Sequence, residues 1–241
     1  LGNNDLASKY FQQAMELCEN SPEVPPEIQA QTYLRIGFFY TEQGKHDSAI
    51  SLYEKAVASA QKVNQKLITA ISLHSIGINN FDIGNLPKAV VALYDAIKIY
   101  ESMRIDLTDK SQISIFELQS KTYTILQKTL IAQNKFQEAL EVAERGRARA
   151  FVNLLTSRIS GKQVNQLNLQ PPTIEKIQKI AREQNATIVE YTIAQPENNQ
   201  DYPKTWHPSE MYIWVVKPTG EITFKQVDLT TLKTPLVDRS E

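Results

Sequence analysis

The chain has 241 residues, 41% of them hydrophobic, which is enough for one large or two modest domains with a buried core. Its 26 Lys and Arg against 27 Asp and Glu leave a net charge of −1, so no global field favours nucleic acid or an anionic membrane surface. The single cysteine, Cys18, excludes an internal disulfide framework and a cysteine-rich zinc site, and it fits a reducing compartment such as the cytoplasm.

Targeting signals are also missing from the sequence. No apolar run of about 18 residues exists, so we expect no membrane-spanning segment. Residues 1–5 have neither the basic start nor the apolar stretch of a signal peptide. Because the chain opens with Leu1 and not with methionine, we expect it to begin inside a longer gene product or after processing.

The predicted elements form two groups that meet near residue 160. Before that point apolar residues recur every three or four positions, which predicts helices. They cover residues 3–19, 26–43, 46–63, 66–83, 87–104, 109–133 and 135–158. After the Pro171-Pro172 break, β-branched and aromatic runs predict strands over 187–193, 211–216 and 222–227. We therefore expect a mainly α protein, with a helical domain over 1–160 and a small α/β segment over 161–241.

One residue pattern occurs twice in the helical part. Gly37, Gly44, Ala49 and Ala56 recur 40 residues later as Gly77, Gly84, Ala89 and Ala96. A small residue inside one helix lets an antiparallel partner approach closely, and the second glycine lies where the first helix must end. Helix pairs of this kind are apolar on two sides, so they are expected to stack into a superhelix.

Two partial copies flank this pair. A weaker third copy, 50 residues beyond the second, consists of Leu126, Asn134, Ala139 and Gly146. Near the start of the chain, Ala7, Phe11 and Ala14 have the spacing of Ala49, Tyr53 and Ala56, which makes this segment half a copy.

These residues resemble the tetratricopeptide repeat (TPR) signature. The resemblance is carried by Ile36, Gly37, Tyr40, Gly44, Ala49, Tyr53 and Ala56, and in the second copy Asn80 replaces the expected tyrosine. The period of 40 exceeds the usual 34, which implies longer helices. The resemblance covers about residues 1–155, and it implies an α-α superhelix whose first helix in each pair lines a concave groove for a protein or peptide.

The family's groove positions can be carried over to this chain. They are Gln31, Leu34, Phe38 and Thr41, then Ile71, His74, Ile78 and Phe81, then Lys121, Thr124, Lys128 and Ile131. Such a mixed lining suits an extended peptide or an amphipathic helix. The apolar members could instead contact the next repeat, and Phe38 fits a core position as well. Leu34, Phe38 and Ser75 stand where the chaperone-binding subclass has Lys and Asn, so recognition of a chaperone tail is disfavoured.

A second resemblance lies in residues 135–159. The string from Ala143 to Ala150, A-E-R-G-R-A-R-A, is similar to the junction helix of proteins in which TPR repeats precede a CHAT domain, a caspase-like cysteine peptidase module. Residues 186–191 and 212–222, with the turn Lys217-Pro218-Thr219-Gly220, resemble its opening strands. This implies a bacterial origin and the chain's own downstream CHAT domain as a partner. Because no Pro or turn cluster interrupts residues 135–159, we also expect a stiff helix that couples the groove to that domain.

The sequence predicts no catalysis by this chain. A caspase-like site needs a cysteine activated by a histidine at the ends of neighbouring strands. Cys18 is expected to pack on the first helix, His46 and His74 lie on repeat helices, and His207 lies in a polar loop. Phosphate-binding, zinc-protease and serine-hydrolase motifs are absent, so we expect no cofactor and no metal. Glu141 and Glu144 share a helical face, and the neighbouring Arg145, Arg147 and Arg149 favour a solvated or ion-paired surface over acid–base catalysis.

The favoured interpretation is a non-catalytic interaction scaffold, the regulatory TPR segment of a CHAT-type peptidase. The alternative is a stand-alone TPR adaptor with a degenerate α/β cap and no peptidase. An independent enzyme built on residues 161–241 is the least favoured, because so few elements leave little room for a preorganised site. An unpaired edge of the small sheet is expected to be covered by residues 230–241 or by a homodimer.

Overall fold

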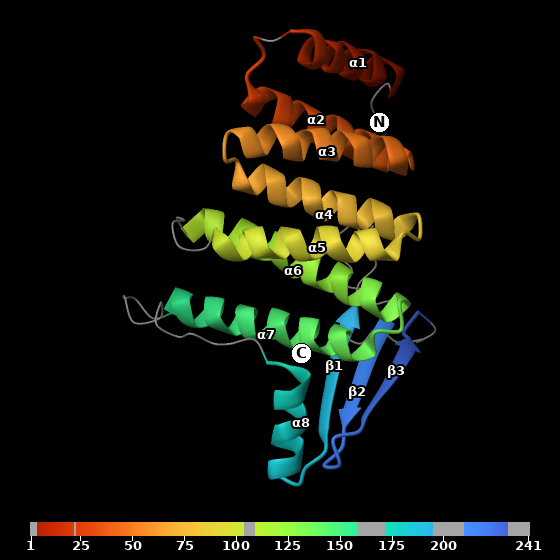
Figure 1. Ribbon diagram of the computed structural model, residues 1–241, viewed down its shortest axis with the longest axis vertical. Coiled ribbons are helices and arrows are strands. Elements are labelled where there is room, and N and C mark those ends of the chain that lie inside the picture. The colour runs from red at the N-terminus through yellow and green to blue at the C-terminus, as the bar shows by residue number, and fades with distance from the viewer. Residues whose placement is uncertain (1–3, 22, 104–108, 159–171, 195–209, 231–241) are drawn as a thin grey trace, which may run out of the picture. The chain divides into compact units, whose positions relative to one another are not determined.

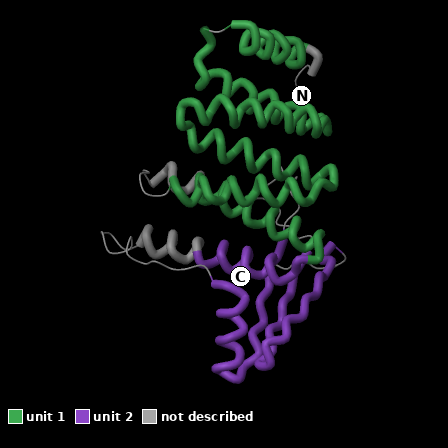
Figure 2. Tube along the Cα trace, in the orientation of Figure 1, with its two compact units in different colours: residues 1–134 green, residues 135–241 purple. Residues whose placement is uncertain are grey.

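A computed structural model describes residues 4–21, 23–103, 109–158, 172–194 and 210–230 of the chain. Helices come first and a small antiparallel sheet follows, as Figure 1 shows. The chain divides into two compact units, Leu1–Asn134 and Lys135–Glu241 (Figure 2). The mainly α fold with a TPR-like arrangement and about three strands is therefore confirmed.

The helices of the first unit agree with the predicted ranges to within about two residues. They are α1 (Asn4–Asn20), α2 (Pro26–Glu42), α3 (His46–Lys62), α4 (Lys66–Asp82), α5 (Leu86–Ser102) and α6 (Asp109–Ala132). From α2 to α5 each helix has 17 residues, and the intervening turns cover residues 43–45, 63–65 and 83–85. Two such helices with their turns account for the period of 40, so the surplus over 34 lies in longer helices, as predicted.

Left-handed residues end these helices. Gly44 has a φ of +69° and Gly84 a φ of +76°, a conformation that is free of strain for glycine. The amide of the residue after each glycine donates back into the helix, from Lys45 to the carbonyl of Tyr40 at 2.9 Å in the first case. Asn64, with a φ of 54°, takes the same place in the α3–α4 turn. The predicted helix end at Gly44 is confirmed.

The paired helices approach closely at the two internal glycines. A Cβ on Gly37 would lie 2.5 Å from Cε1 of Tyr53, and one on Gly77 would lie 2.5 Å from Cγ of Leu93. The close approach predicted at Gly37 is thus confirmed, and its partner across the pair is the ring of Tyr53. Tyr53 and Leu93 are fully buried, since only a residue without a side chain leaves room for them.

A core cluster joins the first three helices. It consists of Cys18, Tyr33, Leu34, Ile36, Ala49, Leu52, Tyr53 and Ala56, with Phe11 and Tyr40 among the half-buried residues against it. Cys18 is 7% exposed and packs inside this cluster, as predicted. Apolar burial of this kind supplies most of the stability of short helices, which are marginal on their own.

The second unit contains two helices and a sheet. Its elements are α7 (Phe136–Arg158), α8 (Ile174–Glu183), β1 (Ile188–Ala194), β2 (Glu210–Val216) and β3 (Ile222–Asp228). The strands pair antiparallel in the order β1-β2-β3, with Tyr191 opposite Ile213 and Trp214 opposite Phe224. Gly220 has a φ of +88° and the amide of Lys217 donates to Glu221 at 2.9 Å, so the predicted β2–β3 hairpin turn is confirmed.

The core of this unit lies among α7, α8 and the sheet, and α8 contributes the buried Ile177 and Ala181. Trp214 is fully buried, and its indole N–H donates to the carbonyl of Phe136 at 2.8 Å. The ring of Phe136 stacks on Phe224 with centroids 4.3 Å apart. The helix runs unbroken through Gly146, as predicted. This helix belongs to a compact unit that begins at Lys135. The change in composition lies near residue 160, and the domain boundary predicted there stays a prediction.

Candidate functional site: the faces of the repeat helices

The predicted groove residues of α2 differ in exposure. Gln31 is exposed, and Phe38 is 42% exposed with its ring edge-on to Tyr53 at a centroid distance of 5.7 Å. Leu34 is 9% exposed and belongs to the core cluster, so it packs against neighbouring helices. Thr41 is half-buried. Phe38 is therefore the large apolar side chain that α2 offers to a ligand on this face.

On α4 the predicted residues lie mostly between helices. His74 is 9% exposed, and its Nδ1 is 2.9 Å from the hydroxyl of Thr122 on α6. Burial, together with the nearby Lys121, lowers the pKa of His74 to about 4, so the ring is neutral at pH 7. Ile71, Ile78 and Phe81 are half-buried. His74 thus serves to join α4 to α6.

On α6, the first helix of the weak third repeat, the accessible predicted residues are polar. Lys121 is exposed and Lys128 is half-buried, and the hydroxyl of Thr124 donates to the carbonyl of Ser120 at 3.1 Å. Ile131 is 7% exposed. Peptide binding by the predicted residues of α2, α4 and α6 stays a prediction. Leu34 and His74 are buried, so these two side chains have little surface left to contact a peptide.

A polar network that the sequence analysis did not foresee links α2, α3 and α4. The hydroxyls of Thr41 and Tyr53 are 3.0 Å apart, and the side-chain amide of Asn79 donates to Thr41 at 3.0 Å. The Oδ1 of Asn79 is 2.9 Å from Nδ1 of His46, which lies 3.8 Å from Asp82. Asn79 is fully buried. Since buried polar groups need partners, the network fixes how one repeat sits on the next.

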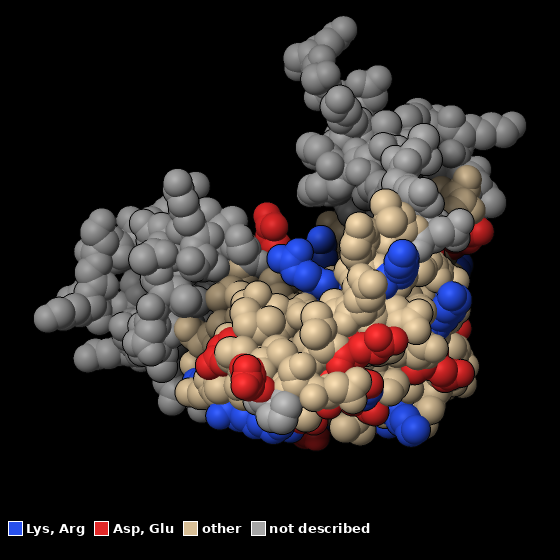
Figure 3. Space-filling view, turned by 90° about the horizontal axis from the view of Figure 1, so that it is seen from above, with Lys and Arg blue, Asp and Glu red and all other residues tan. Residues whose placement is uncertain are grey.

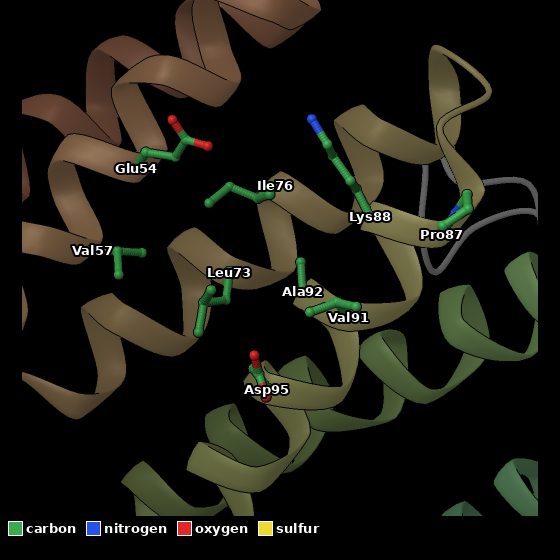
Figure 4. Close-up of a pocket in the computed structure, with 9 residues that line it drawn as sticks. All are labelled: Glu54, Val57, Leu73, Ile76, Pro87, Lys88, Val91, Ala92 and Asp95. Carbon is green, nitrogen blue, oxygen red and sulfur yellow. The ribbon is translucent and has the colours of Figure 1, made fainter.

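An apolar groove opens between α3 and α5, with α4 as its floor (Figure 4). We call it the α3–α5 groove, and its volume is about 480 Å³. Its lining consists of Glu54, Val57, Leu73, Ile76, Pro87, Lys88, Val91, Ala92 and Asp95. Glu54 and Lys88 extend toward its mouth from opposite sides, with Ile76 between them. None of the predicted groove residues lines it. The sequence feature that could have indicated this groove is Val91, an apolar residue that the structure shows to be exposed beside Ala92.

In the second unit Arg147 holds α7 against β1. Its guanidinium contacts Glu144, donates to Glu190 at 2.9 Å and donates to the carbonyl of Tyr191 at 3.0 Å. Burial and the neighbouring Glu144 raise the pKa of Glu190, and Arg147 opposes this shift. The ion-paired interpretation of Glu144 and Arg147 is confirmed. His207 lies outside the described residues.

No group of three or more His, Cys, Asp and Glu side chains in the described ranges is arranged to hold a metal ion. None of the helices that the structure describes combines the length and the apolar character needed to cross a membrane.

The stacked antiparallel helix pairs of the first unit define a helical-repeat protein. Residues 28–102, which span α2 to α5, match the family model of the tetratricopeptide repeat. The chain is also similar to tetratricopeptide repeat protein 28 of Mus musculus and of Homo sapiens. Each is 36% identical over 123 residues, which is 50% of this chain and 5% of the relative. The chain thus spans about one twentieth of the length of these curated relatives.

Proposed function

We propose that this chain is a protein-interaction scaffold that binds a protein or peptide through its TPR repeats. The observation that carries the proposal is the match of residues 28–102 to the TPR family, together with the close helix pairing at Gly37 and Gly77. Stacked repeats of this kind present extended surfaces whose residues can vary without loss of the fold. The proposal therefore rests on the fold, and two surfaces of the repeats are candidates for the binding site.

The first candidate surface is the face predicted from the TPR resemblance. Phe38 and Gln31 are exposed on α2, and Lys121 is exposed on α6. An amphipathic partner would place an apolar side chain on Phe38 and acidic or amide groups near Lys121. Aromatic residues that are half exposed in the free protein are frequent anchors of peptide binding.

The α3–α5 groove is the second candidate surface. Its floor of Leu73 and Ile76 is apolar, and Glu54 and Lys88 give its mouth both signs of charge. A groove with an apolar floor and a few polar groups at its edge is typical of sites that take one or two side chains of a ligand.

A display selection against the whole chain distinguishes these surfaces. Peptides would be selected from a random library, and their Kd values measured for the wild type, Phe38→Ala and Val91→Ser by isothermal titration calorimetry. A loss of about tenfold or more with Phe38→Ala alone supports the predicted face, since truncation of an aromatic anchor removes at least about 1.4 kcal/mol. A loss with Val91→Ser alone assigns binding to the α3–α5 groove. Peptides that are insensitive to both changes would exclude both surfaces, and a selection that yields no saturable binder would overturn the scaffold proposal.

We further propose that the chain is the non-catalytic, regulatory segment of a CHAT-type cysteine peptidase. The resemblance of residues 143–150 to the junction helix supports this, and so does the continuous α7 fastened to the sheet by Phe136 and Arg147. A bacterial origin and a cytoplasmic location belong to the same proposal. The alternative is a stand-alone TPR adaptor with a small α/β cap.

A peptidase assay tests the non-catalytic part of the proposal. The purified chain should leave a panel of fluorogenic peptides intact, because Cys18 is packed in the core cluster and cannot meet a substrate. Cleavage that disappears with Cys18→Ser would show catalysis by this chain and refute the assignment.

Pairing of two copies along the sheet is a further part of the proposed function. Among the described strands β1 and β3 are the outer ones, and an outer strand offers unpaired backbone groups. Light scattering should then show a dimer. A monomer at all concentrations would refute the proposed dimer.

A further inference from the structure

The α3–α5 groove has a counterpart one repeat earlier, between α1 and α3. A shift of 40 residues relates the two repeats, so Ala92 corresponds to Leu52 and Leu73 corresponds to Tyr33. Leu52 is 5% exposed and Tyr33 is 6% exposed, and both belong to the core cluster of the first three helices. In the earlier repeat, two large side chains are therefore buried at the positions where the α3–α5 groove has Ala92 and Leu73.

The floor and one wall of the α3–α5 groove are more open and more apolar than their counterparts. Ile36 of α2 is 1% exposed, whereas Ile76, at the same position of α4, is half-buried and lines the groove. On the wall, Val91 is 62% exposed where the earlier repeat has Ser51. Because the two repeats share one fold, we attribute the open groove to these residue differences and not to the repeat architecture.

The charged residues at the two positions also differ. In the earlier repeat Lys55 of α3 pairs with Glu19 of α1, and its Nζ lies 5.7 Å from the centroid of the Tyr33 ring. Glu54 and Lys88 extend toward the mouth of the α3–α5 groove from α3 and α5 (Figure 4). Neither has an ion-pair or hydrogen-bond partner in the part of the chain that the structure describes. An ion pair thus bridges α1 and α3, whereas two opposite charges are available to a ligand at the mouth of the groove.

Charge of one sign does not dominate the rest of the visible surface. Among the described residues on the face that Figure 3 shows, acidic and basic side chains are interspersed and neither sign covers a large area. Asp95, which also lines the groove, is paired with Lys98 of the same helix at 2.9 Å. The charges that would select a ligand for the groove are therefore the local ones of Glu54 and Lys88.

The groove is complete within the repeat array. Its lining comes from α3, α4 and α5 alone, and these three helices pack on one another and on α2 and α6. Its volume of about 480 Å³ lies in the range of about 300–1,000 Å³ that is typical of ligand sites. Lys88 and Asp95 lie two helical turns apart, which is about 10 Å along α5. This length suits two apolar side chains that are four positions apart on a helix.

We propose that the α3–α5 groove binds an amphipathic helix of a partner protein, which inserts two apolar side chains between α3 and α5. The partner helix carries a basic residue on the flank that meets Glu54 and an acidic residue on the flank that meets Lys88, because both charges lack a partner among the described residues. This inference rests on the scaffold function proposed above, for which it names the surface and the ligand.

A focused library of helical peptides provides the probe. Each displayed peptide has about 18 residues, or five turns, with leucines four positions apart and with Lys, Glu or Gln at the two flanking positions. Selection on the whole chain should enrich Lys at one flank and Glu at the other. The best peptide is then stapled, because an isolated helix of this length is marginal in water, and it should bind saturably by fluorescence anisotropy.

Ala92→Leu introduces the residue of the earlier repeat and is the main variant. Its side chain would occupy the groove beside Leu73, so the Kd of the selected peptide should rise about tenfold or more. Val91→Ser introduces the other residue of the earlier repeat and should also weaken binding, because it removes apolar surface from the wall. Leu67→Ser is the matched control, since Leu67 is 38% exposed at the start of α4 and does not line the groove. It should leave the Kd unchanged, and thermal unfolding checks that each variant is folded.

An exchange of charges tests the expected flanks of the partner helix. Glu54→Lys should weaken binding of the selected peptide about two- to fivefold, which is the size expected of an exposed ion pair. A peptide whose basic flanking residue is changed to Glu should recover the affinity with Glu54→Lys. Lys88→Glu should behave in the same way with a peptide whose acidic flanking residue is changed to Lys.

Two results would overturn the binding of a helix in this groove. One is a focused library that yields no saturable binder, and the other is a Kd that neither Ala92→Leu nor Val91→Ser changes. The scaffold function would survive both results if peptides from the random library bind at Phe38, so the failure of the two proposals can be distinguished.

Two further results would assign the groove to another occupant. In the absence of peptide, a photoreactive residue at position 91 could crosslink to residues beyond 158 of the same chain, and mass spectrometry would identify the product. That result would overturn the partner helix in favour of a segment of the chain itself. A dimer by light scattering that Ala92→Leu dissociates would overturn it in favour of a second copy.

Discussion

The two compact units reach their stability by different routes. In the first unit each helix packs mainly on the next one along the chain, and the same contact recurs, with Tyr53 over Gly37 and Leu93 over Gly77. In the second unit the core joins distant parts of the chain, since Trp214 of β2 donates to Phe136 at the start of α7. A repeated local contact leaves a period in the sequence, whereas a single distant contact leaves none.

This difference also determines how each unit responds to substitution. A position in the first unit has an equivalent one in the next repeat, so the same change can be made twice and its effects compared. The second unit has one central aromatic group, Trp214 with Tyr212 and Phe224, whose rings lie 6.3 and 5.1 Å from that of Trp214. We therefore expect the largest single effect there.

Trp214→Ala should have the largest effect of the changes considered. It removes a fully buried indole and leaves the carbonyl of Phe136 without that donor, so we expect a loss of about 3–5 kcal/mol in the free energy of unfolding of the second unit. Hydrogen exchange of the β2 amides measures it. Val189→Ala, at a position 57% exposed on β1, should change little and serves as the control. Unchanged protection in Trp214→Ala would show that the sheet does not depend on α7.

His74 gives a pH-dependent test in the first unit. Its pKa in the fold is about 4 against an ordinary value of 6.5, so the unfolded chain binds more protons between these values. Stability is therefore full above pH 6.5 and is lost as the pH falls toward 4. Between pH 7 and pH 5 we expect a loss of about 2 kcal/mol from this residue.

Urea unfolding of the wild type and of His74→Asn at both pH values isolates that effect. The variant keeps a polar group near Thr122 on α6 but does not titrate, so the contributions of other groups cancel in the comparison. Lys121 is the charged group that adds to the shift, and it stays in both proteins. Equal pH dependence in the two proteins would mean that the ring of His74 is accessible to protons in the folded state.

Much of the fold could be predicted from the sequence, for reasons that the particular residues show. The recurrence of Gly37 and Gly44 after 40 residues predicted the helix pairs, because a close crossing and a left-handed helix end both need glycine. Strands β2 and β3 were predictable because two β-branched and aromatic runs flank the turn residues Pro218 and Gly220. These signals are local, so one sequence is enough to find them.

The candidate site was less predictable. Carrying over the family's groove positions selected a helix face, but it could not tell how far the next repeat covers that face. Leu34 and His74 are covered, while Phe38 is open. The α3–α5 groove depends on the gap between two helices that are not adjacent in the chain, and Val91 alone signalled it. Asn79 was missed because its partners, Thr41 and His46, lie in other helices.

The comparison of Gly37 with Gly77 sharpens the picture of repeated contacts. An added methyl would press on the rigid ring of Tyr53 in the first repeat and on the flexible side chain of Leu93 in the second. We expect Gly37→Ala to lower the free energy of unfolding by about 1–2 kcal/mol and Gly77→Ala by less, since the gain in helix propensity, about 1 kcal/mol, offsets part of both. Thermal unfolding measures the difference.

A double-mutant cycle with Tyr53→Ala checks the cause. If the ring of Tyr53 is responsible, Gly37→Ala should be neutral or stabilising in the Tyr53→Ala background, where the space is empty. Additive effects would mean that the glycine is required for another reason, and the proposed equivalence of the two repeats would then fail.

The helix-ending glycines should show the smallest and most uniform effect. Gly44 and Gly84 have φ values of +69° and +76°, and a Cβ at either one would have no atom within 4 Å, so a substitution is opposed only by the backbone conformation. We expect Gly44→Ala and Gly84→Ala each to lower the free energy of unfolding by about 1 kcal/mol. Gly44→Asn should lower it by less, because Asn64 already adopts a φ of 54° in the equivalent α3–α4 turn. Urea unfolding of the three variants gives this order if the turns are interchangeable parts of one repeat. An alanine effect at Gly44 several times larger than that at Gly84 would show that the two turns have different roles.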